Sequence, residues 1–72
     1  MKKELEILDV VVALQDRPQE RIRKGSLGTI VEIFDGGRFL VEFADLNGVP
    51  YAMPILSGDQ MLKIYQEPVE AA

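Results

Sequence analysis

The stretch from residue 25 to residue 45, GSLGTIVEIFDGGRFLVEFAD, constrains the fold more than any other part of the chain. Two runs rich in β-branched and aromatic residues flank Asp35, Gly36 and Gly37, a combination typical of a β-hairpin. A three-residue loop, with a type I turn followed by Gly37 in the left-handed region, separates apolar from charged side chains better than a two-residue loop. The stretch therefore predicts two paired strands with a defined register, because a shift of one residue would reverse both faces.

The predicted register assigns the hairpin side chains to two faces. The core face holds the pairs Thr29–Phe43, Val31–Val41 and Ile33–Phe39, and the outer face holds Ile30, Glu32, Phe34, Arg38, Leu40 and Glu42. A second three-residue turn, Leu46-Asn47-Gly48, predicts that the same core face continues into a strand over residues 49–56, with the pairs Phe43–Tyr51 and Val41–Met53. Pro50 and Pro54 lack backbone donors, so this strand should be an edge strand.

The N-terminal part predicts a strand and then a charged loop. Over residues 5–14 alternation places Leu8, Val10, Val12 and Leu14 on one side and Asp9, Val11 and Ala13 on the other. The second side is not polar, so either the strand is buried on both sides or Val11 is covered by a neighbouring element or a second subunit. Pro18 ends the strand region, and in the loop that follows Ile22 should anchor the chain to the core.

The C-terminal part predicts a single turn and a short closing strand. Residues 57–60, with a serine and an aspartate, favour one turn of 3₁₀ helix. Residues 61–65 should then form the last strand beside the first, with Leu62 and Ile64 inward and Lys63 in water. Residues beyond 66 should be frayed.

Composition limits both the core and the available chemistry. Seventy-two residues predict one domain, ordered from about residue 5 to residue 66, whose small core favours self-association as a way to bury more apolar surface. The chain has no His and no Cys, and Glu32 and Glu42 lack an apolar enclosure that would raise a pKa, so we expect no enzyme, metal or cofactor. No signal-like or membrane-spanning apolar run is visible, which predicts a cytoplasmic protein without a membrane partner.

The order of the predicted elements resembles the SH3-like barrel, and we therefore expect an all-β, five-stranded SH3-like barrel. The segments DVVVAL (9–14), GTIVE (28–32), VEFAD (41–45) and the NG…YA stretch ending at Ala52 resemble an uncharacterised family of short prokaryotic proteins, domain-of-unknown-function family 4926. This resemblance covers residues 5–65 and implies no activity and no site residues. Residues 25–43 are also similar to the KOW-type SH3-like segment of ribosomal and transcription-factor proteins, which implies nucleic-acid binding.

Two surfaces are candidate sites. The candidate protein interface is apolar with a charged rim and consists of Val11, Ile30, Phe34, Arg38 and Leu40. Four of the eight basic residues form a candidate patch for an anion or an acidic partner, although a cluster of this kind is more often a solvated loop: Arg17, Arg21, Arg23 and Lys24.

These surfaces favour a non-enzymatic protein-interaction module. It would act as a homo-oligomer, most simply a homodimer, or as the partner or neutraliser of another protein, as an antitoxin or immunity protein does. The alternative is a KOW-like module that binds RNA or DNA through residues 17–24. The net charge of −4 repels phosphate backbones and makes nucleic acid the less favoured partner.

Overall fold

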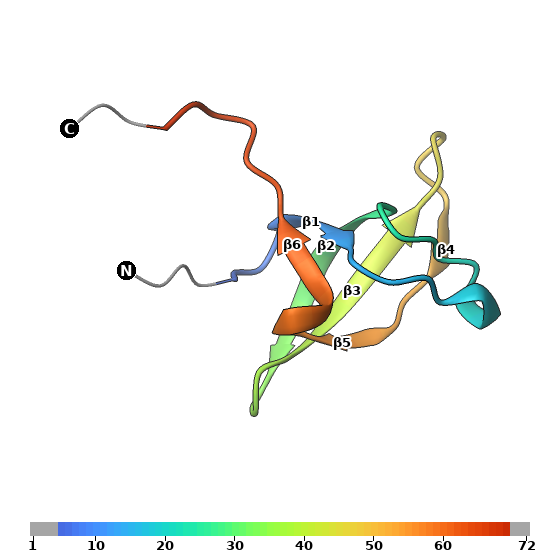
Figure 1. Ribbon diagram of the computed structural model, residues 1–72, viewed down its shortest axis with the longest axis horizontal. Coiled ribbons are helices and arrows are strands. Elements are labelled where there is room, and N and C mark those ends of the chain that lie inside the picture. The colour runs from blue at the N-terminus through green and yellow to red at the C-terminus, as the bar shows by residue number, and fades with distance from the viewer. Residues whose placement is uncertain (1–4, 70–72) are drawn as a thin grey trace.

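A computed structural model describes residues 5–69, and the predicted fraying of residues 1–4 and 70–72 lies outside this range. The described chain is all-β, as expected, with two single-turn 3₁₀ helices and no α-helix (Figure 1). Its elements are β1 (Val10–Ala13), η1 (Pro18–Glu20), β2 (Leu27–Phe34), β3 (Arg38–Ala44), β4 (Pro50–Ala52), β5 (Ile55–Ser57), η2 (Gly58–Gln60) and β6 (Met61–Lys63).

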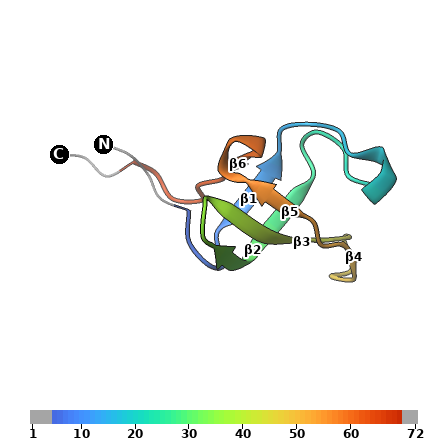
Figure 2. The same cartoon turned by 90° about the horizontal axis from the view of Figure 1, so that it is seen from below.

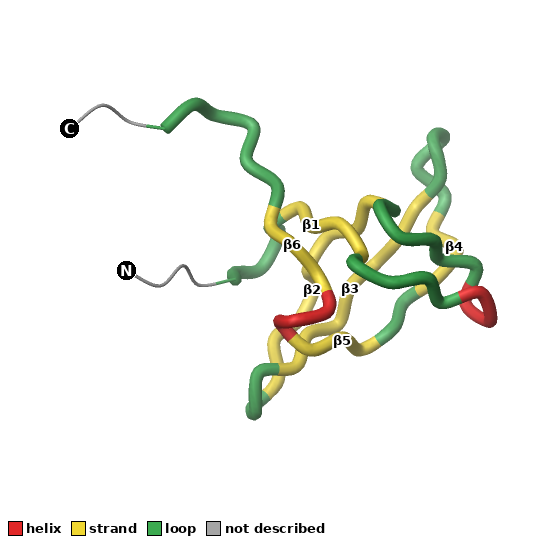
Figure 3. The backbone as a smooth tube through the Cα atoms, in the orientation of Figure 1, coloured by secondary structure: helices red, strands yellow, loops and turns green. Residues whose placement is uncertain are grey.

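The strands form one antiparallel sheet. Their order is β4-β3-β2-β1-β6, and β5 pairs with β3 outside this path. The predicted pairing of the last strand with the first is confirmed, but no strand pairing among the described residues closes the sheet into a barrel. The sheet is curved, with β1 and β6 above the β2–β3 hairpin in Figure 2, and the loop that carries η1 lies at the end of the molecule away from residues 5 and 69 (Figures 1 and 3).

The β2–β3 hairpin confirms the predicted register only next to its turn. Ile33 pairs with Phe39 as expected, and Gly37 has a φ of 74°. Gly36 also has a positive φ, 81°, which excludes a type I turn because the second central residue of that turn has a negative φ.

A β-bulge at Val31 changes the pairing beyond this point. The register shifts between Ile30 and Glu32, so that Ile30 lies opposite Val41. The predicted pairs Val31–Val41 and Thr29–Phe43 are therefore wrong. A bulge bends its strand and increases the local twist, which allows β2 to pair with β1 over residues 27–29 while it remains paired with β3.

The two faces of β1 are the reverse of the prediction. Val11 and Ala13 are buried, whereas Val10 and Val12 lie on the outer side and are only half-buried. Strand β6 is reversed in the same way, because Met61 is buried and Leu62 is exposed. Alternation could not decide the inward side of β1, since both sides of this strand are apolar.

The predicted strand over residues 49–56 is two strands, because Met53 and Pro54 separate β4 from β5. Gly48 has a φ of 80°, as the turn predicted, but Phe43 pairs with Ala52 rather than with Tyr51, and a register shift follows. The predicted 3₁₀ turn is confirmed as η2.

Strand β5 pairs with β3 and ends in a capping box. The side chain of Gln60 accepts a hydrogen bond of 2.9 Å from the backbone N–H of Ser57, and the Ser57 side chain bonds the backbone of Gln60 in return. This box fixes the direction in which the chain leaves β5 for β6.

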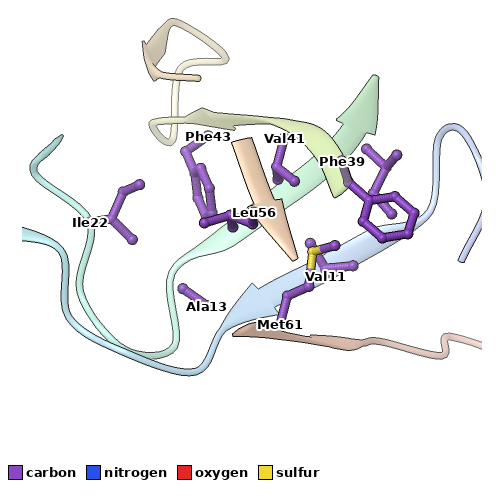
Figure 4. Packing of buried hydrophobic residues seen from close by; sticks show 9 residues of the cluster. Val11, Ala13, Ile22, Phe39, Val41, Phe43, Leu56 and Met61 are labelled. Atoms are coloured by element: carbon purple, nitrogen blue, oxygen red, sulfur yellow. The ribbon is translucent and has the colours of Figure 1, made fainter. Parts of the chain in front are cut away.

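The core contains only apolar side chains among the described residues. Figure 4 shows them converging from the sheet, from β5 and from the long loop after β1. Ile22, 2% exposed, reaches this cluster from the loop and confirms the predicted anchor. The complete cluster is Val11, Ala13, Ile22, Ile30, Phe39, Val41, Phe43, Leu56 and Met61.

Gly28 should be the least replaceable glycine of the chain. A Cβ atom at this position would lie 2.7 Å from Val41 Cγ1 and 3.0 Å from the Phe43 ring. We expect Gly28→Ala to lower the free energy of unfolding by about 1–3 kcal/mol, because the extra methyl overpacks the core. Urea denaturation measures the loss. The control is Gly48→Asn, at a positive φ with open space around it, which should cost less than about 1 kcal/mol. Equal stability of Gly28→Ala and the wild type would contradict this packing.

Candidate functional site

The predicted protein interface is only partly on the surface. Phe34, 37% exposed, and Arg38 lie at the turn end of the hairpin, and Leu40 is half-buried beside them. Val11 and Ile30 are 0% exposed and belong to the core, so their assignment to the interface was wrong. The physical reason is the bulge at Val31 for Ile30 and the reversed faces of β1 for Val11.

The remaining hairpin patch has a neighbour that the sequence did not indicate. Ile55 on β5 lies opposite Leu40 on β3 and is exposed. We call Phe34, Leu40 and Ile55 the hairpin patch. Glu32 and Arg38 border it, because Glu32 pairs with Leu40 and Arg38 pairs with Phe34.

A second apolar surface, which we call the outer row, crosses β6, β1 and β2. Val12 on β1 lies opposite Leu27 on β2 and opposite Leu62 on β6. Leu27 and Leu62 are 58% and 56% exposed, and Val12 is half-buried between them. The outer face of a half-buried antiparallel sheet is usually polar, so this row is an unusual place for three aliphatic side chains.

A shallow hollow of about 300 Å³ adjoins the outer row. Its only ionisable side chain is Glu42, and its lining consists of Val10, Leu27, Gly28, Thr29, Glu42 and Ala44. Such a surface can contact another apolar surface but offers no set of groups for acid–base or nucleophilic chemistry. The alternation of Val10 and Val12 was a signal for this surface, but the other side of the strand is also apolar, so the sequence did not show which side faces outward.

The basic loop, residues 17–24, holds its four cations in different ways. The Arg17 Nε atom donates to Glu20 Oε1 at 2.5 Å and forms an ion pair with it. The Arg21 guanidinium carbon lies 5.7 Å from the centroid of the Tyr51 ring. Arg23 and Lys24 are exposed and use their backbone N–H groups within the loop, toward Ser26 Oγ and Asp16 Oδ1 respectively. Sequence reasoning missed Tyr51, which comes from β4 and is distant in sequence.

Residues 5–69 show no further feature that would indicate a metal site, a membrane-spanning helix or an unpaired buried polar group. No cluster of three or more His, Cys, Asp or Glu side chains there could hold a metal ion. Within the same range no helix has the length and apolarity to cross a membrane, and every buried side-chain nitrogen or oxygen has a hydrogen-bond partner.

One ion pair links the start of β1 to β6. Lys63 Nζ lies 3.2 Å from Asp9 Oδ2, and the same carboxylate oxygen accepts the backbone N–H of Glu6 at 2.8 Å. The hydrogen bond to Asp9 raises the pKa of Lys63 above its ordinary value, with burial acting in the opposite direction. The ion pair and this hydrogen bond connect the turn that precedes β1 to β6 at the edge of the sheet.

The geometry thus defines a small all-β protein that presents an apolar row and a cationic loop on its surface. Residues 7–63 match the family model described as "Domain of unknown function (DUF4926)". The chain therefore belongs to the DUF4926 family, as the resemblance indicated. Neither the curated proteins nor the solved structures contain a match to this chain.

The pKa of Lys63 should depend on Asp9. We expect Asp9→Asn to return this pKa toward its ordinary value of 10.5, because the raising hydrogen bond to a carboxylate is lost. Since the pKa is raised in the folded state, the stabilisation is complete below pH 10.5 and disappears as the pH rises through the folded-state pKa. An NMR titration of the Lys63 side chain measures the change. Asp35→Asn in the hairpin turn is the control, and an equal shift in both variants would argue against a specific pair.

Proposed function

We propose that this chain is a non-enzymatic protein-interaction module whose outer row packs against a second copy of itself. The observation that carries the proposal is the exposure of Leu27 and Leu62 on either side of Val12. Removal of such side chains from water contributes about 25 cal/mol for each Å² of apolar surface. The proposal differs from the sequence-based one in its surface, because Val11 and Ile30 are unavailable.

The outer row is compatible with a two-fold symmetric contact. Its central residue, Val12, has one leucine on each flank, and the two leucines are almost equally exposed. A two-fold axis between two facing sheets and parallel to β1 would place Val12 on Val12 of the second copy. The same operation would place Leu27 on Leu62 of the second copy, so each subunit covers the same apolar row.

Charge also favours this arrangement. The three side chains of the outer row are uncharged, so their burial leaves no charge without a partner. Glu42 lies on β3, on one side of the three strands that would overlap, and the same two-fold axis moves its copy to the opposite side. The two Glu42 carboxylates therefore do not face each other in the interface.

The expected association is modest in strength. A specific interface buries about 800 Å² on each partner, about one-seventh of the 5641 Å² that this chain exposes. The outer row must therefore be extended by its neighbours: Val10 lies on the same outer side of β1 as Val12, and the exposed Leu14 follows directly after this strand. We expect a dimer that dissociates on dilution rather than an obligate one.

We further infer that the curved sheet is an SH3-like barrel. The order of elements supports this inference: a long loop after β1, the β2–β3 hairpin, and a single 3₁₀ turn, η2, that connects β5 directly to β6. The pairing of β6 with β1 brings the last strand beside the first, as that architecture requires.

Self-association should depend on the outer row and not on the hairpin patch. We expect the double variant Leu27→Lys and Leu62→Lys to be monomeric, because each dimer would bury four ammonium groups without partners. Sedimentation equilibrium from micromolar to millimolar protein measures the association, and circular dichroism checks the fold.

Phe34→Lys is the control for this experiment, since it places one lysine on the other apolar patch. It should leave the dimer intact. Dissociation by Phe34→Lys would show that the dimer interface is the hairpin patch and not the outer row. A wild type that stays monomeric at all concentrations would contradict the proposed homodimer and indicate that the outer row binds a different protein.

A further inference from the structure

The basic loop has an ordered base, from which its side chains extend. Arg17 and Ile22 exchange two backbone hydrogen bonds, of 2.8 and 3.1 Å, and the Ile22 side chain is in the core. Gly25 donates a further bond of 2.7 Å to the carbonyl of Ala13 at the end of β1. Because the loop backbone is tied to the sheet in this way, its cations are positioned before any partner arrives, which lowers the entropic cost of binding.

Arg21 and Arg23 are the cations available to a partner. Arg17 is already neutralised by Glu20, but neither Arg21 nor Arg23 forms an ion pair with a carboxylate anywhere in residues 5–69. Arg21 has a φ of 64°, a left-handed conformation that is unfavourable for a bulky residue, and its guanidinium lies near the face of Tyr51. Packing on an aromatic ring leaves the edge of a guanidinium free to bind a carboxylate with two parallel hydrogen bonds.

These two arginines border a shallow, open hollow of about 460 Å³. Pro18 and Ile22 supply apolar lining, and Asp16 is the only acidic residue in it. Asp16 Oδ1 accepts the backbone N–H of Lys24 at 2.7 Å, so this carboxylate is used within the loop. Taken together, the lining residues are Asp16, Pro18, Arg21, Ile22 and Arg23.

The distribution of charge favours the binding of short anions over long ones at the basic loop. The basic loop carries four positive charges and one negative, a net +3, whereas the whole chain carries −4, so the other residues sum to −7. Fields are screened over about 8 Å at physiological ionic strength, so a short anion in the hollow experiences mainly the basic loop and the adjoining Asp16, which together carry a net +2. A nucleic acid long enough to leave the loop would instead meet the acidic remainder of the molecule.

We propose that the hollow in the basic loop binds an acidic peptide segment of another protein. A glutamate or aspartate side chain of the segment pairs with Arg21 and Arg23, and an adjoining apolar residue packs over Pro18. This site is separate from the outer row, so a monomer and a dimer bind the segment equally.

The test uses a fluorescein-labelled hexaglutamate peptide and the full-length protein. Fluorescence anisotropy should show saturable binding that weakens as salt is added. We expect Arg21→Gln with Arg23→Gln to weaken the affinity by at least about tenfold, since two charge-assisted contacts are lost. Arg23→Gln alone should lose about threefold or more. Asp16→Asn should strengthen binding, because it removes the one negative charge of the lining and keeps the oxygen that caps Lys24.

Arg38→Gln is the matched control, with the same change of charge at the hairpin turn, far from the basic loop in Figure 1. The affinity of this variant for hexaglutamate should stay within about twofold of the affinity of the wild type. NMR shift changes on addition of the peptide should concentrate in residues 16–26. Absence of saturable binding, or an equal loss in Arg38→Gln, would overturn the proposal. A labelled twelve-residue oligothymidine that binds more tightly than hexaglutamate at the same residues would overturn it in favour of nucleic acid.

Discussion

The packing of β3 side chains over Gly28 on β2 marks the side of the sheet that becomes the core. The space that a side chain would fill at this position is occupied by Val41 and by the Phe43 ring. Val11 lies opposite Gly28 in the neighbouring strand, so it joins the same side and is completely buried. Because side chains alternate along a strand, Val12 must then face outward. The outer row is therefore the opposite side of the strands that pack their core face over Gly28.

Most predictions that succeeded were local, and most of those that failed depended on contacts between strands. The exceptions are the pairing of β6 with β1, which was predicted correctly, and the type I turn of the hairpin, which was not. The turn glycines, the 3₁₀ turn and the anchor at Ile22 follow from residue types within a few positions of each other, and the structure has them where the sequence indicated. The bulge at Val31 could not be predicted in this way, since it depends on the demand that β2 pair with β1 and β3 at once. The inward side of β1 was equally undetermined, because Val10, Val11, Val12 and Ala13 are all apolar.

The candidate sites follow the same division. The cluster of cations in residues 17–24 is visible in the sequence, but their differences are not. Glu20 neutralises Arg17 because η1 brings these two residues together over three positions. Tyr51 reaches Arg21 only through the fold, from a strand thirty residues away in the chain. Two of the three members of the hairpin patch, Phe34 and Leu40, were identified from the sequence. The third, Ile55, was not, because it belongs to a strand that the sequence joined to β4.

The two surfaces should respond to ionic strength in opposite directions, which follows from their chemistry. The outer row is uncharged, and two copies that meet there each carry a net charge of −4. Salt screens the repulsion between the copies and leaves the apolar contact in place, so the association becomes tighter. At the basic loop the attraction itself is electrostatic, and the same salt weakens it. As the ionic strength rises, binding of acidic segments at the basic loop therefore weakens while pairing through the outer row strengthens, each independently of the other.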